Sequence, residues 1–236
     1  MTAINVVRQL DAVHIISDGV FCDTDGFVLN IGPNTWFLPH LSAAIGIHGS
    51  PHFMPFLINR LGGECRSFED IAAKILTIAL DVHISFPMTH GTLGWGNINP
   101  EFDLFVVGWS EARGQPISYL VARPGRGTGS QVSADWRVVE LPDLLIAPPL
   151  NERVGRADGW KPPTSAEAFQ VEPDGIKLVE AQRFTPTRIN SEGGIGFSVG
   201  GFVQLTSVSA QRVTSRILLR WPDKVGRKIE PQRHEP

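Results

Sequence analysis

Two histidines, His48 and His52, stand four residues apart at the beginning of a predicted helix. This spacing can place two imidazoles on one face of a helix, where they could bind a zinc ion. No aspartate or glutamate lies between them, and the sequence offers no evident third ligand. We therefore expect no metal at this pair, and a buried or surface position is the simpler interpretation of each histidine.

The other chemically capable groups form no recognisable site on their own. Gly193–Gly196 is rich in glycine, but it precedes a strand and lacks the lysine and hydroxyl residue of a phosphate-binding loop. Cys22 and Cys65 fit neither a CxxC motif nor a disulfide framework, which indicates two reduced thiols. The tryptophans are scattered along the chain without basic interleaving, which favours packing over base stacking. No cofactor is predicted.

The composition excludes several kinds of partner. Of the 236 residues, 42% are hydrophobic and 19% are charged, and the formal net charge of −3 leaves no basic surplus to attract nucleic acid. Asn5, Arg8 and Asp11 interrupt the first residues too early for the apolar core of a signal peptide. The apolar runs fall far short of the roughly 20 residues that span a bilayer. We expect a cytoplasmic globular protein with no nucleic acid or membrane partner.

The elements that would position these residues begin with short strands. The chain carries 24 glycines and 18 prolines, which indicates many turns. Between the turns, runs rich in β-branched residues predict strands. Five are expected before the first helix, at Ala3–Arg8, Ala12–Ile16, Phe27–Ile31, Thr35–Leu38 and Ser42–Ile47.

Two helices are expected after these strands. Ser50 and the proline that follows it would begin the first helix, and Gly62-Gly63 would end it. Ser67 is followed by two acidic residues and would cap the second helix, whose apolar residues recur at helical spacing from Ile71 onward. A loop is predicted over Pro87–Pro100.

Strands and one further helical stretch are predicted in the second half. The order of elements, with helices between antiparallel hairpins, favours helices packed on sheets. We expect a single domain over residues 1–221 and a polar tail over residues 222–236. The predicted strands are Phe102–Trp109, Ile117–Ala122, Trp136–Glu140, Leu144–Ile146, Phe202–Ala210 and Val213–Trp221, and the helical stretch covers Ser165–Gln170 and Gly175–Phe184.

The first residues carry a pattern that later segments continue. Thr2 stands directly after Met1, and the turn Ser17-Asp18-Gly19 places Asp18 sixteen residues after Thr2. The segments that follow in order are Ser42–Gly49, Phe105–Ser110 and Gly200–Leu205. Together these pieces resemble the N-terminal-nucleophile hydrolases, in particular proteasome β subunits and the bacterial HslV peptidase. The resemblance implies an α+β fold, a four-layer αββα sandwich of two antiparallel sheets flanked by helices, and assembly into a homo-oligomer or larger protein complex.

The resemblance also implies a site. Thr2 would be the nucleophile once Met1 is removed, with its own α-amino group as the base. Asp18 would orient the proton transfer, and Gly49 would lie near the oxyanion. Asn34 stands where the family keeps a lysine. His48, beside the glycine turn, and Ser198 would line the same cleft.

The departures from the family pattern weigh against that chemistry. Asn34 can donate a hydrogen bond but carries no positive charge. The segment Leu144–Leu150, which falls where a serine–glycine loop is expected, has no hydroxyl and contains two prolines. Gly196 and Val199 stand where an aspartate and a serine are expected, although a shift of one residue recovers Ser198. We therefore favour a catalytically degenerate protein that acts through assembly or protein binding, with an N-terminal threonine amidohydrolase as the alternative.

Overall fold

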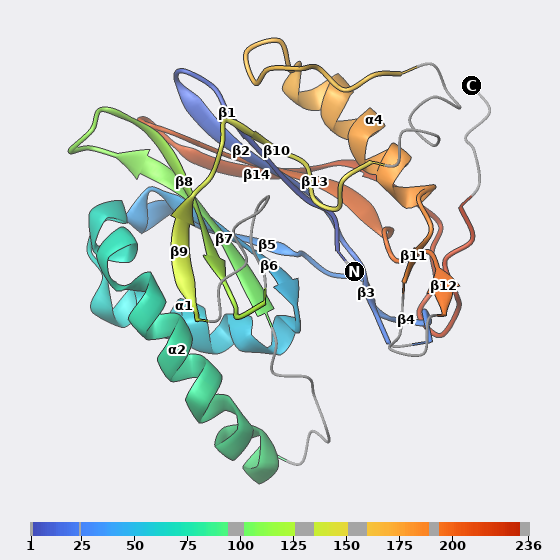
Figure 1. Cartoon of the computed structure of the whole chain (residues 1–236), viewed down its shortest axis with the longest axis horizontal. Coiled ribbons are helices and arrows are strands. Elements are labelled where there is room, and N and C mark those ends of the chain that lie inside the picture. The colour runs from blue at the N-terminus through green and yellow to red at the C-terminus, as the bar shows by residue number, and fades with distance from the viewer. Residues whose placement is uncertain are drawn as a thin grey trace.

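The protein has a mixed α/β fold with two large antiparallel sheets (Figure 1). The computed structural model describes residues 2–23, 25–93, 102–125, 135–150, 160–188 and 194–231, with side chains in the helix over 68–93 described as far as Phe86. Among these residues, no helix is both long enough and apolar enough to cross a membrane.

The first sheet joins strands from the two halves of the chain. Its order is β10-β1-β2-β13-β14, and every neighbouring pair is antiparallel. β2 and β13 are therefore central, although they lie far apart in the sequence. The bounds are β1 (Ile4–Arg8), β2 (Ala12–Asp18), β10 (Leu144–Leu145), β13 (Phe202–Ser209) and β14 (Val213–Arg220).

The second sheet follows the order of the chain, β5-β6-β7-β8-β9, again with antiparallel neighbours. Two small hairpins, β3–β4 and β11–β12, complete the described strands. The bounds are β5 (Thr35–Leu38), β6 (Ala43–Gly49), β7 (Phe102–Ser110), β8 (Gln115–Ala122), β9 (Arg137–Glu140), β3 (Phe21–Cys22), β4 (Val28–Asn30), β11 (Thr187–Arg188) and β12 (Ile195–Gly196).

Helices cover one face of each sheet, and the two sheets pack against each other. α1 (Met54–Glu64) and α2 (Phe68–Leu93) share a buried apolar cluster with β6 and β7 of the second sheet, whereas α4 (Val171–Arg183) shares one with β2 and β13 of the first (Figure 1). A third cluster, which includes Ile4, Ile15 and Phe105, joins the two sheets. This arrangement is compatible with the predicted sandwich.

Alternation along β6 sorts its side chains between these layers. Ala43, Ile45 and Ile47 belong to the cluster with α1 and α2, while Ala44 belongs to the cluster between the sheets. Gly46 lies on the same face as Ala44, and a Cβ atom there would approach Ile4 Cδ1 to 3.3 Å. The absence of a side chain at this position therefore lets the start of β1 pack closely on β6.

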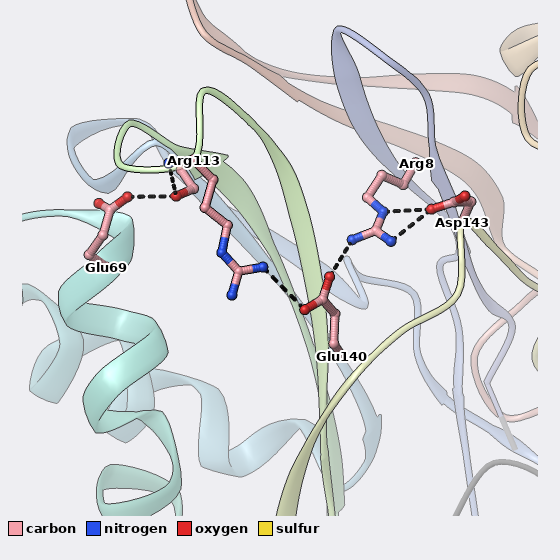
Figure 2. A network of polar contacts seen from close by, with 6 residues as sticks. Arg8, Glu69, Arg113, Glu140 and Asp143 are labelled. Carbon is pink, nitrogen blue, oxygen red and sulfur yellow. Dashed lines mark hydrogen bonds and ion pairs between the residues drawn. The ribbon is translucent and has the colours of Figure 1, made fainter.

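At its other end, β1 finishes in an ion-pair network that links both sheets (Figure 2). Arg8 contacts Asp143 beside β10 at 2.7 Å and Glu140 of β9 at 2.9 Å. Arg113, in the turn between β7 and β8, contacts the second oxygen of Glu140 at 3.2 Å. These groups are partly exposed, so Arg8 joins the edge of the second sheet to the first sheet at the molecular surface.

The five predicted amino-terminal strands are present, and so are the four predicted strands that form the β7–β8 and β13–β14 hairpins, with ends shifted by one or two residues. Ser67 caps α2 as predicted, since its hydroxyl accepts a hydrogen bond of 3.2 Å from the Asp70 N–H. The third helix differs, because α4 begins only at Val171 and the segment Ser165–Gln170 lies outside it.

One predicted helix end is displaced by a single residue, and another is wrong. α1 continues through Gly62-Gly63 to Glu64, where the N–H of the buried Cys65 still bonds to the Leu61 carbonyl. α2 runs past Pro87 to Leu93, so the predicted loop is wrong over its first seven residues, and residues 94–100 lie outside the described ones. Phe86, whose ring centroid lies 4.1 Å from that of Phe53, packs this part of α2 against the core, and this packing outweighs the local preference of proline.

Candidate functional site

The carboxylate of Asp18 joins three segments that are distant in the sequence. Asp18 is the last residue of β2, which lies between β1 and β13, and its side chain is fully buried. Its Oδ1 accepts hydrogen bonds of 3.0 Å from the Ala3 N–H and from Asn34 Nδ2. Its Oδ2 accepts a hydrogen bond of 3.0 Å from the Gly200 N–H. Both oxygens are therefore committed to the protein's own donors.

The electrostatics of Asp18 are dominated by burial. Burial raises the pKa of Asp18 to about 7, against the opposing effect of the hydrogen bonds from Gly200, Ala3 and Asn34, which favour the anion. Among the described residues, no lysine or arginine side chain forms an ion pair or hydrogen bond with this carboxylate. Asp18 is thus a buried carboxyl group with a raised pKa and, among the described residues, no cationic side chain bonded to it.

Asn34 is bound to Asp18 through its amide nitrogen. Asn34 Nδ2 donates to the backbone carbonyl of Asp18 at 2.9 Å as well as to its carboxylate. Because both partners are acceptors, the orientation of the amide is fixed, and its Oδ1 atom points elsewhere. That oxygen is buried and has no hydrogen-bond partner among the described residues. The structure thus brings Asp18 and Asn34 into direct contact and leaves one unsatisfied acceptor beside them.

Thr2 lies at the same end of β1 as the Asp18–Asn34 pair. It directly precedes Ala3, whose N–H bonds to Asp18, and it is only 7% exposed. Ile4 belongs to the cluster between the sheets, while Ala3 belongs to the cluster with α4. By alternation, Thr2 is on the side of the strand that faces the second sheet. The nucleophile proposed from the sequence is therefore adjacent to the Asp18–Asn34 pair and nearly covered.

His48 and Gly49 end strand β6. His48 lies two residues after Gly46 on β6, so the two residues are on the same face of the strand. Gly46 faces Ile4, and this face is therefore turned toward the first sheet. Its Nδ1 atom is 3.5 Å from Oδ2 of Asp103, the residue opposite it on β7. Gly49 has a φ of 122°, a conformation that favours glycine, and is exposed.

The metal interpretation of the two histidines finds no further ligand in the described part of the chain. Within it, no group of three histidine, cysteine, aspartate or glutamate residues is arranged to hold a metal ion. His52 lies in the short 3-10 helix Pro51–Phe53 that precedes α1. The partner of His48 is instead Asp103, a residue that no sequence spacing had connected with it.

Ser198 belongs to a neighbouring group of hydroxyls. It is 2% exposed, and its Oγ atom lies 3.0 Å from the hydroxyl of Thr187 on β11. The segment that it begins reaches Asp18 only two residues later, through the backbone of Gly200. Ser198 thus lies two residues before Gly200, which binds the Asp18 carboxylate, but its own hydroxyl interacts with Thr187.

Gly200 and Gly201 are the site residues that sequence reasoning missed. Gly200 donates to Asp18, and its carbonyl accepts a hydrogen bond of 3.0 Å from the Gly19 N–H. Gly201 has a φ of 73°, and a Cβ atom there would lie 2.2 Å from the Gly19 carbonyl oxygen. Only glycine permits this approach of two backbones. The Gly-Gly pair before a predicted strand was visible in the sequence, but its contact with Asp18 was not.

Comparison with known proteins gives a fold relationship. No family model matches the sequence, and a search of curated proteins finds no match. Among solved structures, a Gly-1 mutant of Anbu from Hyphomicrobium sp. strain MC1 is similar over 93% of this chain and 87% of that chain, with a TM-score of 0.54 and 8% identity. Anbu is an HslV- and proteasome-related N-terminal nucleophile hydrolase. The likeness supports a distant relationship to this class of fold.

Proposed function

We propose that the protein is a catalytically degenerate member of the proteasome- and HslV-like fold that acts in the cytoplasm through assembly or protein binding. The observation that carries the proposal is the state of Asp18. Its two oxygens hold the backbone of Ala3 and Gly200 and the amide of Asn34. In this role the carboxylate stabilises the fold, and among the described residues no lysine or arginine side chain pairs with it to tune proton transfer at Thr2.

Asn34 supports the same conclusion. An amidase of this design requires its nucleophile and base to be tuned by nearby charge. Asn34 supplies a neutral amide where the resemblance places a lysine, and among the described residues its amide nitrogen bonds to Asp18. The α-amino group of Thr2 would gain no help from this side chain in remaining a neutral base.

The proposed architecture is the four-layer αββα sandwich. Support comes from the packing of α1 and α2 on the second sheet, of α4 on the first sheet and of the two sheets on each other. The overall similarity to Anbu agrees with this arrangement. Homo-oligomerisation is part of the proposal, and sedimentation velocity of the purified chain tests it. A single species at the mass of the monomer at all concentrations contradicts that part.

Covalent labelling tests the loss of catalysis. A β-lactone probe acylates an activated threonine hydroxyl, and intact-mass spectrometry reports the added mass. We expect no addition to the folded wild-type protein beyond that seen with Thr2→Ala. Stoichiometric addition to the wild type and none to Thr2→Ala would contradict the proposal and establish Thr2 as a nucleophile.

A second candidate function, an N-terminal threonine amidohydrolase, is favoured by one observation. The buried Oδ1 atom of Asn34 has no donor among the described residues. An unsatisfied buried acceptor costs about 1–3 kcal/mol, and a neutral α-amino group on Thr2 could donate a hydrogen bond to it while its lone pair stays available as the base. Thr2 would then attack an amide carbonyl, its amine would take the hydroxyl proton, and a backbone N–H near Gly49 would stabilise the oxyanion. Full retention of Met1 in the intact mass excludes this candidate.

A further inference from the structure

A pocket of about 590 Å³ lies where the chain leaves β14 and passes the end of α4. It is formed by the C-terminal loop Pro222–Glu230, the last residue of α4 and the β3–β4 hairpin. Its volume is within the range of sites that bind a small ligand or a short segment of another protein. The pocket shares no residue with the Asp18–Asn34 site.

The floor of the pocket is a buried ion pair. Arg183, at the end of α4, makes two hydrogen bonds of 2.7 Å to the two oxygens of Asp223. The two side chains are only 3% and 6% exposed, and the guanidinium lies 4.7 Å from the ring centroid of Trp221. A two-pronged pair of this kind is geometrically rigid. Because the two charges cancel, the floor adds shape to the pocket and no net charge.

The C-terminal loop is fixed to the β3–β4 hairpin. The Val28 N–H donates to the Arg227 carbonyl at 2.9 Å, and the Gly226 N–H donates to the Val28 carbonyl at 2.8 Å. Ile229 is 4% exposed and packs in a cluster with Val20 and Val28. The backbone that carries the loop's side chains is therefore held in place before any partner binds, which reduces the entropy cost of binding.

The rim of the pocket is positively charged, although the whole chain carries −3. Lys224, Arg227 and Lys228 are exposed, and Glu230 is the only acidic residue on the rim. Lys228 lies 4.9 Å above the ring of Phe27. The side chains of Lys224 and Arg227 have no ion-pair or hydrogen-bond partner among the described residues. Within the described ranges, two cations thus stand unpaired over a rigid pocket.

Apolar side chains surround these cations. Phe27, Leu29 and Val225 are three of the eight large apolar residues that are exposed in the described part of the chain, and all three lie on the β3–β4 hairpin or the C-terminal loop. Figure 1 shows this hairpin beside the last, red part of the chain, and an isolated bridge between Phe27 and Lys228 joins the two. Exposed apolar side chains gathered beside unpaired charges are typical of a surface that binds another protein.

We infer that this basic pocket binds an acidic segment of a partner protein, in which carboxylates alternate with apolar side chains. The carboxylates would pair with Lys224 and Arg227, and an apolar side chain would cover Phe27. The inference rests on the proposed protein-binding function, for which it supplies the surface and the chemistry of the partner. Charge complementarity selects an acidic segment over a neutral or basic one.

Fluorescence anisotropy tests the inference with one defined probe, a fluorescein-labelled peptide of sequence Glu-Leu-Asp-Phe-Glu-Leu-Asp. We expect saturable binding to the full chain that weakens as salt is raised, because exposed charge pairs are screened. The double variant Lys224→Glu/Arg227→Glu should lower the affinity at least about tenfold. The matched control Lys177→Glu/Arg212→Glu reverses two exposed cations outside the pocket and should bind the peptide like the wild type.

Every other outcome overturns the inference. No binding by the wild type, equal loss in the two double variants, or equal binding of the amide peptide Gln-Leu-Asn-Phe-Gln-Leu-Asn would each remove the acidic segment as the ligand. A change of oligomeric state in Lys224→Glu/Arg227→Glu alone would identify the pocket as a contact between copies of this chain. Displacement of the peptide by free succinate would indicate a small dicarboxylate site. Labelling of Thr2 by the β-lactone would refute the proposed loss of catalysis separately, whatever the peptide does.

Discussion

The two ends of strand β1 hold charge in opposite ways. Before its start, the Asp18 carboxylate is fully buried, has no cationic side chain paired with it among the described residues and is held by backbone and amide donors. At its other end, Arg8 pairs with Asp143 and Glu140 at the surface (Figure 2). Burial raises the pKa of Asp18, whereas the hydrogen bond from Arg8 lowers the pKa of Glu140.

Because of this difference, loss of a partner should cost much more stability at the buried end of β1 than at the exposed, charged end. At the buried end, each lost acceptor leaves an N–H group without water or a partner, which is expensive. At the exposed end, water replaces a lost partner, and a surface ion pair contributes about 0–1 kcal/mol. The comparison predicts that equal changes at the two ends have very unequal effects on the free energy of unfolding.

Removal of the Asp18 carboxylate should have the largest effect. Asp18→Ala leaves the Ala3 and Gly200 N–H groups and the Asn34 amide without their acceptor, so we expect the free energy of unfolding to fall by about 4 kcal/mol. Urea denaturation followed by circular dichroism measures it. A loss below about 1 kcal/mol would show that water reaches this end and would break the comparison.

The pH dependence of stability should also differ between the ends. The pKa of Asp18 is about 7 in the folded protein, above its value of about 3.9 in an unfolded chain. As pH rises from about 4 to about 7, the unfolded chain loses this proton first, so the contribution of Asp18 to stability declines by a few kcal/mol. Glu140, with a lowered pKa, contributes stability that is instead lost as pH falls through the acid range.

The measurement compares wild type with Asp18→Asn by urea denaturation at several pH values. Burial also lowers the pKa of His14 to about 4, which makes stability fall as pH drops below about 6.5, opposite to the contribution of Asp18. His14 is unchanged in the variant, so the difference between the two proteins isolates Asp18. Parallel stability curves for the two proteins would mean that Asp18 stays ionised throughout this range.

Glycines with similar backbone conformations sharpen the comparison further. Gly201 lies at the buried end with a φ of 73°, and Gly114 lies in the β7–β8 turn near Arg113 with a φ of 62°. A Cβ atom would meet the Gly19 carbonyl at the first position and no atom within 4 Å at the second. We expect Gly201→Ala to cost about 3 kcal/mol and Gly114→Ala about 1 kcal/mol in thermal or urea unfolding. Equal losses would show that the positive φ alone, and not the contact with the Gly19 carbonyl, sets the cost of the substitution.

The sequence predicted local features of this site better than its contacts. Strand β2 follows from a run of β-branched residues, a pattern that acts over a few positions, although the strand continues two residues beyond the predicted end, to Asp18. The bond between Asp18 and Gly200 depends on the pairing of β2 with β13 and spans 182 residues. The contact of His48 with Asp103 likewise depends on the register of β6 against β7. No local pattern encodes such a register, so these partners became visible only in the structure.

α2 shows the same rule for the fold. Pro87 predicts a break because proline lacks the N–H that a helix interior uses. The preceding residues Val82 and Phe86 are nevertheless buried against the core, and the helix continues to Leu93. Tertiary burial outweighs the local signal here. At Ser67 the capping residue and the helical spacing of the apolar residues after it agree, and the predicted start of the helix is confirmed. Sequence patterns are thus decisive where local preference and packing point the same way.

The exposed end should respond least. Arg8→Ala removes the two contacts that Arg8 makes to Asp143 and the one that it makes to Glu140, yet water can solvate the freed carboxylates. We expect a loss of about 1 kcal/mol in urea denaturation, declining as salt is raised, because the lost attraction is screened. A double-mutant cycle with Asp143→Asn separates the pair from the packing of the Arg8 stem. A coupling of about 3 kcal/mol that persists in high salt would show that the Arg8 network is shielded from water as Asp18 is. Different exposure to solvent would then not explain a difference between the two ends of β1.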